Sequence, residues 1–364
     1  MEGTHRWYNI FANGGGRRMK RISAKKRAWL ENRRRKLLRF RARQKKRAYH
    51  SNRSAYIEQS ESASCRSFIA PENFSLMNNL EETLRYFYRV TTAIRRCHPN
   101  TTIYFDFSSI ADASPEAFMY IIALLKNNKR IQKNQIFCAG NEPLAPQPRD
   151  ILNRAGFFQY VRSTRFHALE NEESQLRIYR GTQSDPLLAQ KICDFVHART
   201  ESSINRLGTK RLFPMYIELM NNVKQHAFGS ESSTESAFCN WYTYAEDIGN
   251  ELRFVFLDTG KGIPETIRKN LLEKLSIVGS DSRFIASALE GAFRTDTGDK
   301  HRGKGLPEIY DNVKKHAIDS LCIFSGNGLC IVDSYGRITE YNLQHAFNGT
   351  MYVWTIKKEK ILYD

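Results

Sequence analysis

The chain has 364 residues, of which 41% are hydrophobic, and a formal net charge of +18 at pH 7. This length predicts about two domains and a tail. The longest apolar run, residues 118–125, is far too short to span a bilayer, and the basic N-terminus lacks the apolar core of a signal peptide. Seven cysteines without a Cys-x-x-Cys pair favour reduced thiols over disulfides or a zinc site, so we expect a cytoplasmic protein that makes no membrane contact.

The excess positive charge lies in an N-terminal arm. Residues 1–53 contain 19 Lys and Arg residues and 2 Glu residues, and the rest of the chain is nearly neutral. Repulsion between these charges predicts an arm that is disordered or forms a lone helix. Residues 17–47 suit electrostatic binding of nucleic-acid phosphates, and a solvated, dispensable leader is the alternative. The serine-rich residues 54–70 are predicted to be a linker.

Residues 71–170 alternate between predicted helices and strands. Apolar residues at three- and four-residue steps predict the first helix, and Ser114 followed by Pro115 is typical of the start of another. Such an alternation indicates an α/β layer. The expected elements are a helix at 71–98, a strand at 101–107, a helix at 115–126, a strand at 136–139 and a helix at 149–155.

A helical pattern at 215–228 carries polar residues at intervals of four. Glu218, Asn222 and His226 are therefore expected to share one face of that helix. A further helical run at 185–206 precedes it and is expected to pack beside it.

A glycine turn follows a short apolar strand predicted at 252–257. Asp258 ends this strand, and Gly260 and Gly262 lie two residues apart before Ile263. Without a Cβ at these two positions the backbone can turn sharply and lie against a ligand.

Two more glycine motifs lie downstream. Gly303 and Gly305 open a predicted helix that continues to residue 316, and Gly349 precedes Thr350 at the start of a terminal strand. Strands are predicted at 321–324, 329–332, 338–341 and 351–356, with turns between them. We expect these strands to form a mixed sheet with helices on one face.

The four motifs together resemble the GHKL superfamily of ATP-binding domains, which is shared by gyrase, histidine kinases and anti-sigma-factor kinases. The order is Glu-x-x-x-Asn on a helix, Asp-x-Gly-x-Gly-Ile, Gly-x-Gly-Leu and then Gly-Thr. This resemblance implies a Bergerat-type fold, a two-layer α+β sandwich, over residues 175–364. It also implies that ATP and Mg²⁺ are the ligands.

The resemblance assigns roles to the residues of the first two motifs. Asn222 would ligate Mg²⁺ through its side-chain oxygen, and Glu218 would orient or deprotonate an attacking water or hydroxyl. Asp258 would accept a hydrogen bond from the exocyclic amine of adenine, with Gly260 and Gly262 allowing the close approach. Ile263 completes that motif, and His226 would lie near the nucleotide or simply pack.

The remaining motifs would hold the phosphates and support the adenine site. The helix that begins near Gly303, Gly305 and Leu306 would bind phosphates at its N-terminus. Lys304 and Arg302 would add positive charge, and residues 294–302 correspond to a mobile lid in the superfamily. Thr350 resembles the threonine that supports the adenine-binding aspartate.

Residues 71–170 resemble a STAS domain, the fold of anti-anti-sigma factors. The likeness rests on Asp106-Phe107-Ser108 and on Asp112-Ala113-Ser114 at a helix start. In that family a phosphorylated serine occupies the position of Ser114. The glycine-rich continuation of the family is replaced here by Pro115-Glu116-Ala117, and an ordinary helix N-cap is the alternative role for Ser114.

The resulting functional hypothesis is a cytoplasmic, ATP- and Mg²⁺-binding conformational switch with weak ATP hydrolysis. One alternative is an anti-sigma-type serine kinase acting on a STAS-domain serine. Another is a non-enzymatic ATP-sensing module that binds nucleic acid through its basic arm. The expected partners are ATP, a protein partner or a second copy of the chain, and nucleic acid at residues 17–47.

Overall fold

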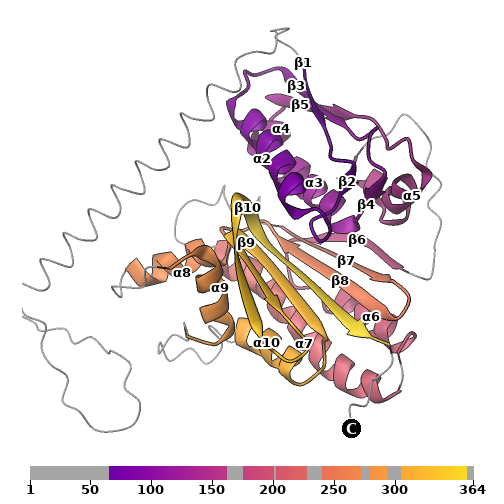
Figure 1. The fold of residues 1–364 in the computed structure, drawn as a ribbon, viewed down its shortest axis with the longest axis vertical. Coiled ribbons are helices and arrows are strands. Elements are labelled where there is room, and N and C mark those ends of the chain that lie inside the picture. Colours follow the sequence, from indigo (N-terminus) through magenta and orange to yellow (C-terminus); the bar gives the residue numbers. More distant parts are fainter. Residues whose placement is uncertain are drawn as a thin grey trace, which may run out of the picture. The chain divides into compact units, whose positions relative to one another are not determined.

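A three-stranded parallel sheet and a five-stranded antiparallel sheet organise the described part of the computed structural model (Figure 1). The mixed α/β class expected from the sequence is therefore confirmed. Residues 64–364 form one compact unit. The predictions for the basic arm, for residues 54–64 of the linker and for the lid lie outside the described residues. These described residues are 65–161, 175–200, 202–227, 240–272, 279–292 and 305–358.

The N-terminal layer is built on a parallel sheet with the strand order β1-β3-β5. Its first strand lies in residues that were predicted to be the end of the linker. The sequence did not reveal this strand because its hydrophobic signal is weak: Phe68 is its only residue with a buried side chain. The strands are β1 (Cys65–Ile69), β3 (Thr101–Asp106) and β5 (Ile136–Gly140), and the helices are α2 (Leu80–Arg96), α3 (Pro115–Asn127), α4 (Lys129–Gln132), α5 (Pro146–Arg154) and the 3₁₀ turn η1 (Phe157–Gln159).

The helix predicted at 71–98 begins later than expected. Residues Asn73–Phe74 form a short strand, β2, which pairs in parallel with β4 (Asp112–Ala113). Phe74 fits the helical spacing, but its ring is wholly buried in the aromatic core and its backbone is extended. The other predicted elements of this layer are present, with bounds that differ by a few residues.

The C-terminal sheet has the order β6-β7-β8-β10-β9, and every neighbouring pair is antiparallel. The prediction of a mixed sheet is therefore wrong for this part of the chain. Its last two strands are also longer than predicted, because bulges in the pairing replace the expected breaks. The strands are β6 (Gln175–Gly181), β7 (Trp241–Asp247), β8 (Glu251–Asp258), β9 (Ser320–Val332) and β10 (Ile338–Lys357).

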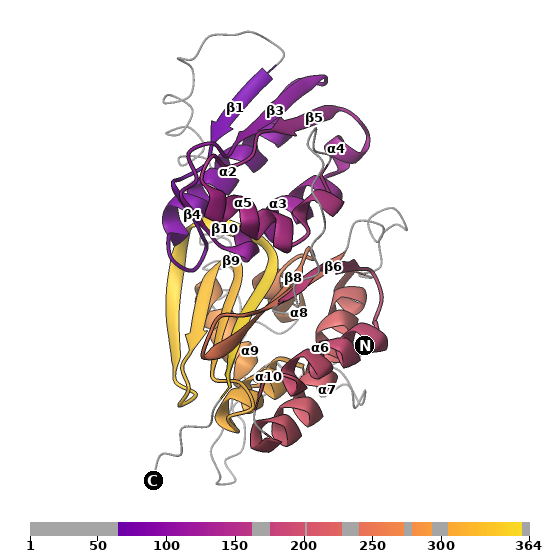
Figure 2. The same ribbon diagram turned by 90° about the vertical axis from the view of Figure 1, so that its right-hand side faces the viewer.

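Helices of the C-terminal segment cover one face of this sheet (Figures 1 and 2). The helical run predicted at 185–206 is divided between two helices, and the second of them includes the predicted helix at 215–228 and passes through Pro214. The helices are α6 (Pro186–His197), α7 (Ser202–Ala227), α8 (Ile263–Leu272), α9 (Asp281–Leu289) and α10 (Gly305–Lys314).

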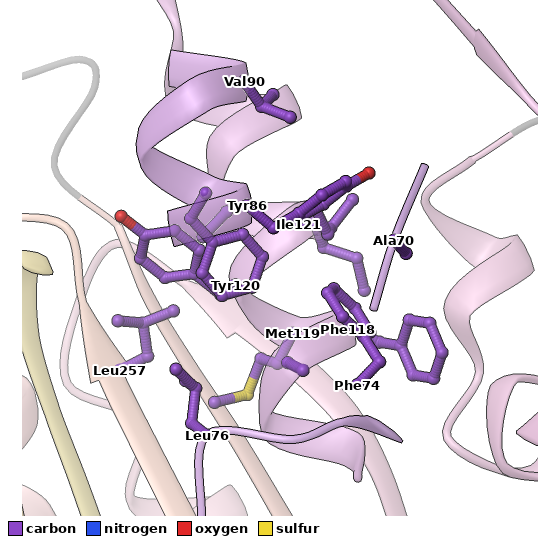
Figure 3. Close-up of a cluster of buried hydrophobic side chains, with 14 of the residues drawn as sticks. Ala70, Phe74, Leu76, Tyr86, Val90, Phe118, Met119, Tyr120, Ile121 and Leu257 are labelled. Carbon is purple, nitrogen blue, oxygen red and sulfur yellow. The ribbon is translucent and has the colours of Figure 1, made fainter. Parts of the chain in front are cut away.

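The second face of the antiparallel sheet is also buried, against α2 and α3 of the N-terminal layer. Along β8, Phe254 and Phe256 belong to the hydrophobic cluster beneath the C-terminal helices, whereas Val255 and Leu257 belong to the cluster of the N-terminal layer. Figure 3 shows Leu257 beside this second cluster, which includes Met119 of α3. Alternate residues of one strand thus stabilise two different cores. The antiparallel sheet and its C-terminal helices make up the two layers that were predicted, and the N-terminal segment adds further layers on the other face of the sheet.

Candidate functional site

Three polar side chains form a row across β8, β10 and β9 of the antiparallel sheet. Asp258 at the end of β8 is paired with Thr350 of β10, and Thr350 is paired with Ser325 of β9. Directly opposed residues of antiparallel strands project to the same face. Phe256 and Tyr352, two residues along the same strands, belong to the cluster beneath the helices, so this row lies on the helix-bearing face.

Hydrogen bonds fix this row and the turn that follows it. The Gly260 N–H donates to Asp258 Oδ1 at 2.9 Å, and the hydroxyls of Thr350 and Ser325 are 3.2 Å apart. Ser325 Oγ also accepts the N–H of Ile263 at 3.0 Å, where α8 begins. The motif predicted from Asp258 to Ile263 is therefore tied to both β9 and β10.

Two glycines have no room for a side chain at this place. Gly262 has φ +81°, and a Cβ there would lie 2.7 Å from Ser325 Oγ. Gly349 has φ +89°, and its Cβ would collide with the carbonyl oxygen of Asp258. Both positions therefore need glycine for backbone conformation and for space.

The protonation of Asp258 is unusual for an aspartate. Burial raises the pKa of its carboxyl to about 6 from the ordinary 3.8, although hydrogen bonds from Gly260 and Thr350 lower it. Desolvation penalises the charged form, so a group that donates to the carboxylate would stabilise it. Asp258 is thus a partly exposed acceptor, and no cationic group in the described part of the chain contributes to this shift.

A second group of predicted residues meets where α7 contacts the start of α10. A Cβ on Gly305 would lie 2.7 Å from Glu218 Cγ and Oε1 and 2.8 Å from Asn222 Nδ2. A side chain at residue 305 would press on both of these side chains, which belong to a motif more than eighty residues away in sequence. Leu306, the next residue, packs partly buried against the cluster beneath the helices.

The helix α10 runs antiparallel to α7, so its N-terminus lies beside the Glu218–Asn222 segment. Towards its other end, Asn312 Oδ1 accepts from the Arg211 guanidinium at 3.2 Å, and Asn312 Nδ2 lies 3.5 Å from Met215 Sδ. The first N–H groups of a helix have no intrahelical acceptor and carry the positive end of the helix dipole.

The two groups lie towards the same end of the sheet. The Tyr216 ring of α7 contacts Phe256 of β8, with centroids 6.3 Å apart. One turn on, Met220 Sδ accepts the N–H of Asp185 at 3.3 Å. Two residues before Asp185, the Gln183 carbonyl accepts a hydrogen bond from the Trp241 indole N–H, and Trp241 is the β7 residue paired with Asp258 of β8. The α7 helix therefore runs towards the Asp258 end of β8.

A cavity of about 140 Å³ lies between α7 and α10. Glu218 and Gly305 contribute to its lining, whereas Asp258, Gly260, Gly262 and Thr350 do not. Its volume is below the roughly 300–1,000 Å³ of ordinary small-molecule pockets. It is therefore a groove beside the second group and not a pocket for a whole nucleotide.

Some predicted site residues cannot be compared with the structure. Arg302, Gly303 and Lys304 lie outside the described residues, and for His226 only the helical backbone is described. Within the described ranges, no group of three or more His, Cys, Asp or Glu side chains is arranged to hold a metal ion. The side-chain oxygen of Asn222 remains the protein ligand expected for Mg²⁺.

Two supporting residues were not predicted from the sequence. Ser325 is identified only by the register of β9 against β10, because no motif surrounds it. Asn240 is wholly buried, and its backbone bonds Thr259, the residue after Asp258, through N–H and carbonyl groups. Long-range pairing, which sequence spacing does not reveal, brings both residues to the motif.

Ser114, the residue at the phosphoacceptor position of the STAS resemblance, is buried. It occupies the N-cap position of α3 as predicted, but its hydroxyl donates to the Glu116 carboxylate and accepts no backbone N–H of the helix. Glu116 is itself completely buried, and Ser75 donates to the same carboxylate oxygen at 3.4 Å. A phosphate on Ser114 would therefore face a buried carboxylate.

No protein-family model matches this chain, and a search of curated proteins finds no significant match. Among the helices that the structure describes, none has an apolar stretch long enough to cross a membrane.

Proposed function

We propose that this protein binds an adenine nucleotide with Mg²⁺ in a GHKL-like manner and acts as an ATP-dependent conformational switch with weak hydrolysis. The observation that carries the proposal is the packing of Gly305 against both Glu218 and Asn222. Three residues from two separate motifs of the resemblance thereby become neighbours. The row of Asp258, Thr350 and Ser325 towards the same end of the sheet supports it independently.

In this proposal the Asp258 carboxylate accepts the exocyclic amine of adenine. Because burial raises its pKa, a further hydrogen-bond donor such as this amine would stabilise the charged form, and the Thr350 hydroxyl holds the carboxylate in place. Guanine presents a carbonyl oxygen at the corresponding position, so the carboxylate would repel it. The adenine specificity would therefore come from Asp258.

The phosphates would lie between the N-terminus of α10 and the Glu218–Asn222 face of α7. The free N–H groups at the start of α10 suit anionic oxygens. Mg²⁺, when bound, would neutralise phosphate charge, and Asn222 has the side-chain oxygen that this ion prefers. Glu218, one turn from Asn222, would orient or deprotonate the attacking water.

The serine-kinase alternative is less well supported. Its acceptor within this chain, Ser114, is 5% exposed and bonded to a buried carboxylate, so transfer to it would first require α3 to separate from its surroundings. The burial of Ser114 does not affect a second form of this hypothesis, in which the kinase acts on a serine of a separate STAS-domain protein.

The fate of γ-labelled ATP distinguishes these functions. Purified protein is incubated with Mg²⁺ and labelled ATP beside Glu218→Gln, which keeps the size of the side chain, and Glu308→Gln, a control on the same cavity. Free phosphate from the wild type and from Glu308→Gln, lost in Glu218→Gln, is the expected result. Acid-stable label on protein would replace the switch by the kinase, and an absence of both products would leave only nucleotide sensing.

A further inference from the structure

The helix α3 of the N-terminal layer contacts both turns that frame the candidate adenine site from behind. Tyr120 and Asn127 are seven residues apart, about two helical turns, and therefore lie on one face of α3. That face meets the antiparallel sheet on the side opposite to the C-terminal helices. No element of the proposed nucleotide site belongs to α3 itself.

Asn127 reaches the turn that contains Asp258. Its side-chain oxygen accepts a hydrogen bond from Asn240 Nδ2, and its own amide donates to Tyr242 Oη at 3.1 Å. The Asn240 carbonyl in turn accepts hydrogen bonds from the Thr259 N–H at 3.0 Å and from the Thr259 hydroxyl at 3.1 Å. The other side-chain atom of Asn240, Oδ1, is buried without a hydrogen-bond partner among the described residues.

Tyr120 reaches the turn that contains Gly349. Its hydroxyl accepts the N–H of Asn348 at 3.3 Å, and its ring packs on Phe347 with centroids 4.7 Å apart. The side chain is 5% exposed, and burial raises the pKa of the phenol to about 12, so it stays a neutral hydroxyl. Two residues after Asn348, Thr350 holds Asp258.

We propose that α3 is the rear support of the adenine site, with Asn127 and Tyr120 as positioning residues that set the preference for adenine over guanine. This inference rests on the proposed function, because it assumes that Asp258 reads the base. A fixed Asp258 rejects guanine by geometry, whereas a loosened turn lets the carboxylate move away from the guanine carbonyl. Nucleotide binding and the packing of α3 against the sheet are then linked equilibria. By reciprocity, packing changes the nucleotide affinity by the same factor by which bound nucleotide changes the packing equilibrium.

The first test needs no nucleotide. Amide hydrogen exchange at Thr259 is measured in the wild type, in Asn127→Ala and in Asn128→Ala. Asn128 is the matched control, because it also makes two side-chain hydrogen bonds, to the N–H groups of Arg130 and Ile131, but these cap α4. Exchange at Thr259 is expected to rise roughly two- to twelvefold, the range for one net hydrogen bond, in Asn127→Ala alone. An equal rise in both variants, or none, would overturn the proposal.

The second test measures the ratio of ATP to GTP affinity by fluorescence titration with the Mg²⁺ complexes. The ratio is expected to fall in Asn127→Ala and in Tyr120→Phe, which removes only a hydroxyl, and to stay at the wild-type value in Asn128→Ala. An unchanged ratio in the first two variants would overturn the positioning role. Wild-type protein that binds neither nucleotide would refute the proposed function instead, and the exchange measurement would still decide whether α3 supports the turn.

Discussion

The close approach of β10 to the end of β8 at Gly349 has a measurable energetic consequence. With φ +89° this residue lies in a region that L side chains rarely adopt, and a Cβ would collide with the Asp258 carbonyl oxygen. The positive φ alone costs about 1–2 kcal/mol, and displacing a packed backbone group adds about 1–3 kcal/mol. Gly349→Ala should therefore lower the free energy of unfolding by about 2–5 kcal/mol, measured by urea titration with far-UV circular dichroism.

Gly249 provides the matched control within the same sheet. Its φ of +92° is nearly the same, but nothing lies within 4 Å of the position of an added Cβ. Gly249→Ala should therefore lose only the conformational part, about 1–2 kcal/mol. The difference between the two variants isolates the steric cost of the close approach. Equal losses in the two variants would refute the explanation of why this motif needs glycine.

Four further predictions concern other parts of the account. The contribution of Asp258 to the free energy of unfolding should fall by roughly 3 kcal/mol between pH 4 and pH 6 and then stay constant. The reason is that its raised pKa of about 6 makes the folded state bind the proton more tightly than the unfolded state does. Urea titrations of Asp258→Asn should lack this pH dependence. Leu257→Ala should cost about 2–5 kcal/mol and speed amide exchange in both sheets, and faster exchange in one sheet alone would contradict the shared core. Ser114→Asp, beside buried Glu116, should lose about 3–5 kcal/mol in thermal unfolding and Ser114→Ala only about 1 kcal/mol, whereas similar losses would argue against the buried carboxylate. Deletion of residues 1–50 should remove salt-sensitive nucleic-acid binding in a filter assay and leave ATP affinity unchanged, and retained binding would exclude the arm.

Local patterns predicted the strands and helices that carry the motifs. The apolar run before Asp258 is β8, and the glycines after it are the turn that was expected. The spacing of Glu218 and Asn222 also placed them on one face of α7, where Gly305 meets both. These features depend on neighbours in sequence, for which periodicity and glycine content are sufficient.

Features that depend on distant pairing were not predictable in the same way. The register that aligns Ser325, Thr350 and Asp258 involves strands with no sequence link, and the helix predicted at 71–98 lost its first turns to pairing with β4. The burial of α3 between two sheets did leave a signal in the sequence, because residues 117–125 form an unbroken apolar run, long enough to cover every side of a helix. Such a helix is typical of the interior between layers. Which layers it separates could only come from the structure.

The most direct test of the proposed nucleotide site is calorimetric titration of ATP and Mg²⁺ into the wild type, Asp258→Asn and Asp333→Asn. Asp333 is a matched control, because it directly follows strand β9 of the same sheet and likewise accepts the N–H two residues on, from Tyr335 at 3.0 Å. We expect binding by the wild type and by Asp333→Asn, and a loss of at least tenfold in Asp258→Asn, since a buried hydrogen bond to a charged group contributes about 1.5–3 kcal/mol. Equal ATP affinity in all three proteins, or no binding by the wild type, would contradict the account.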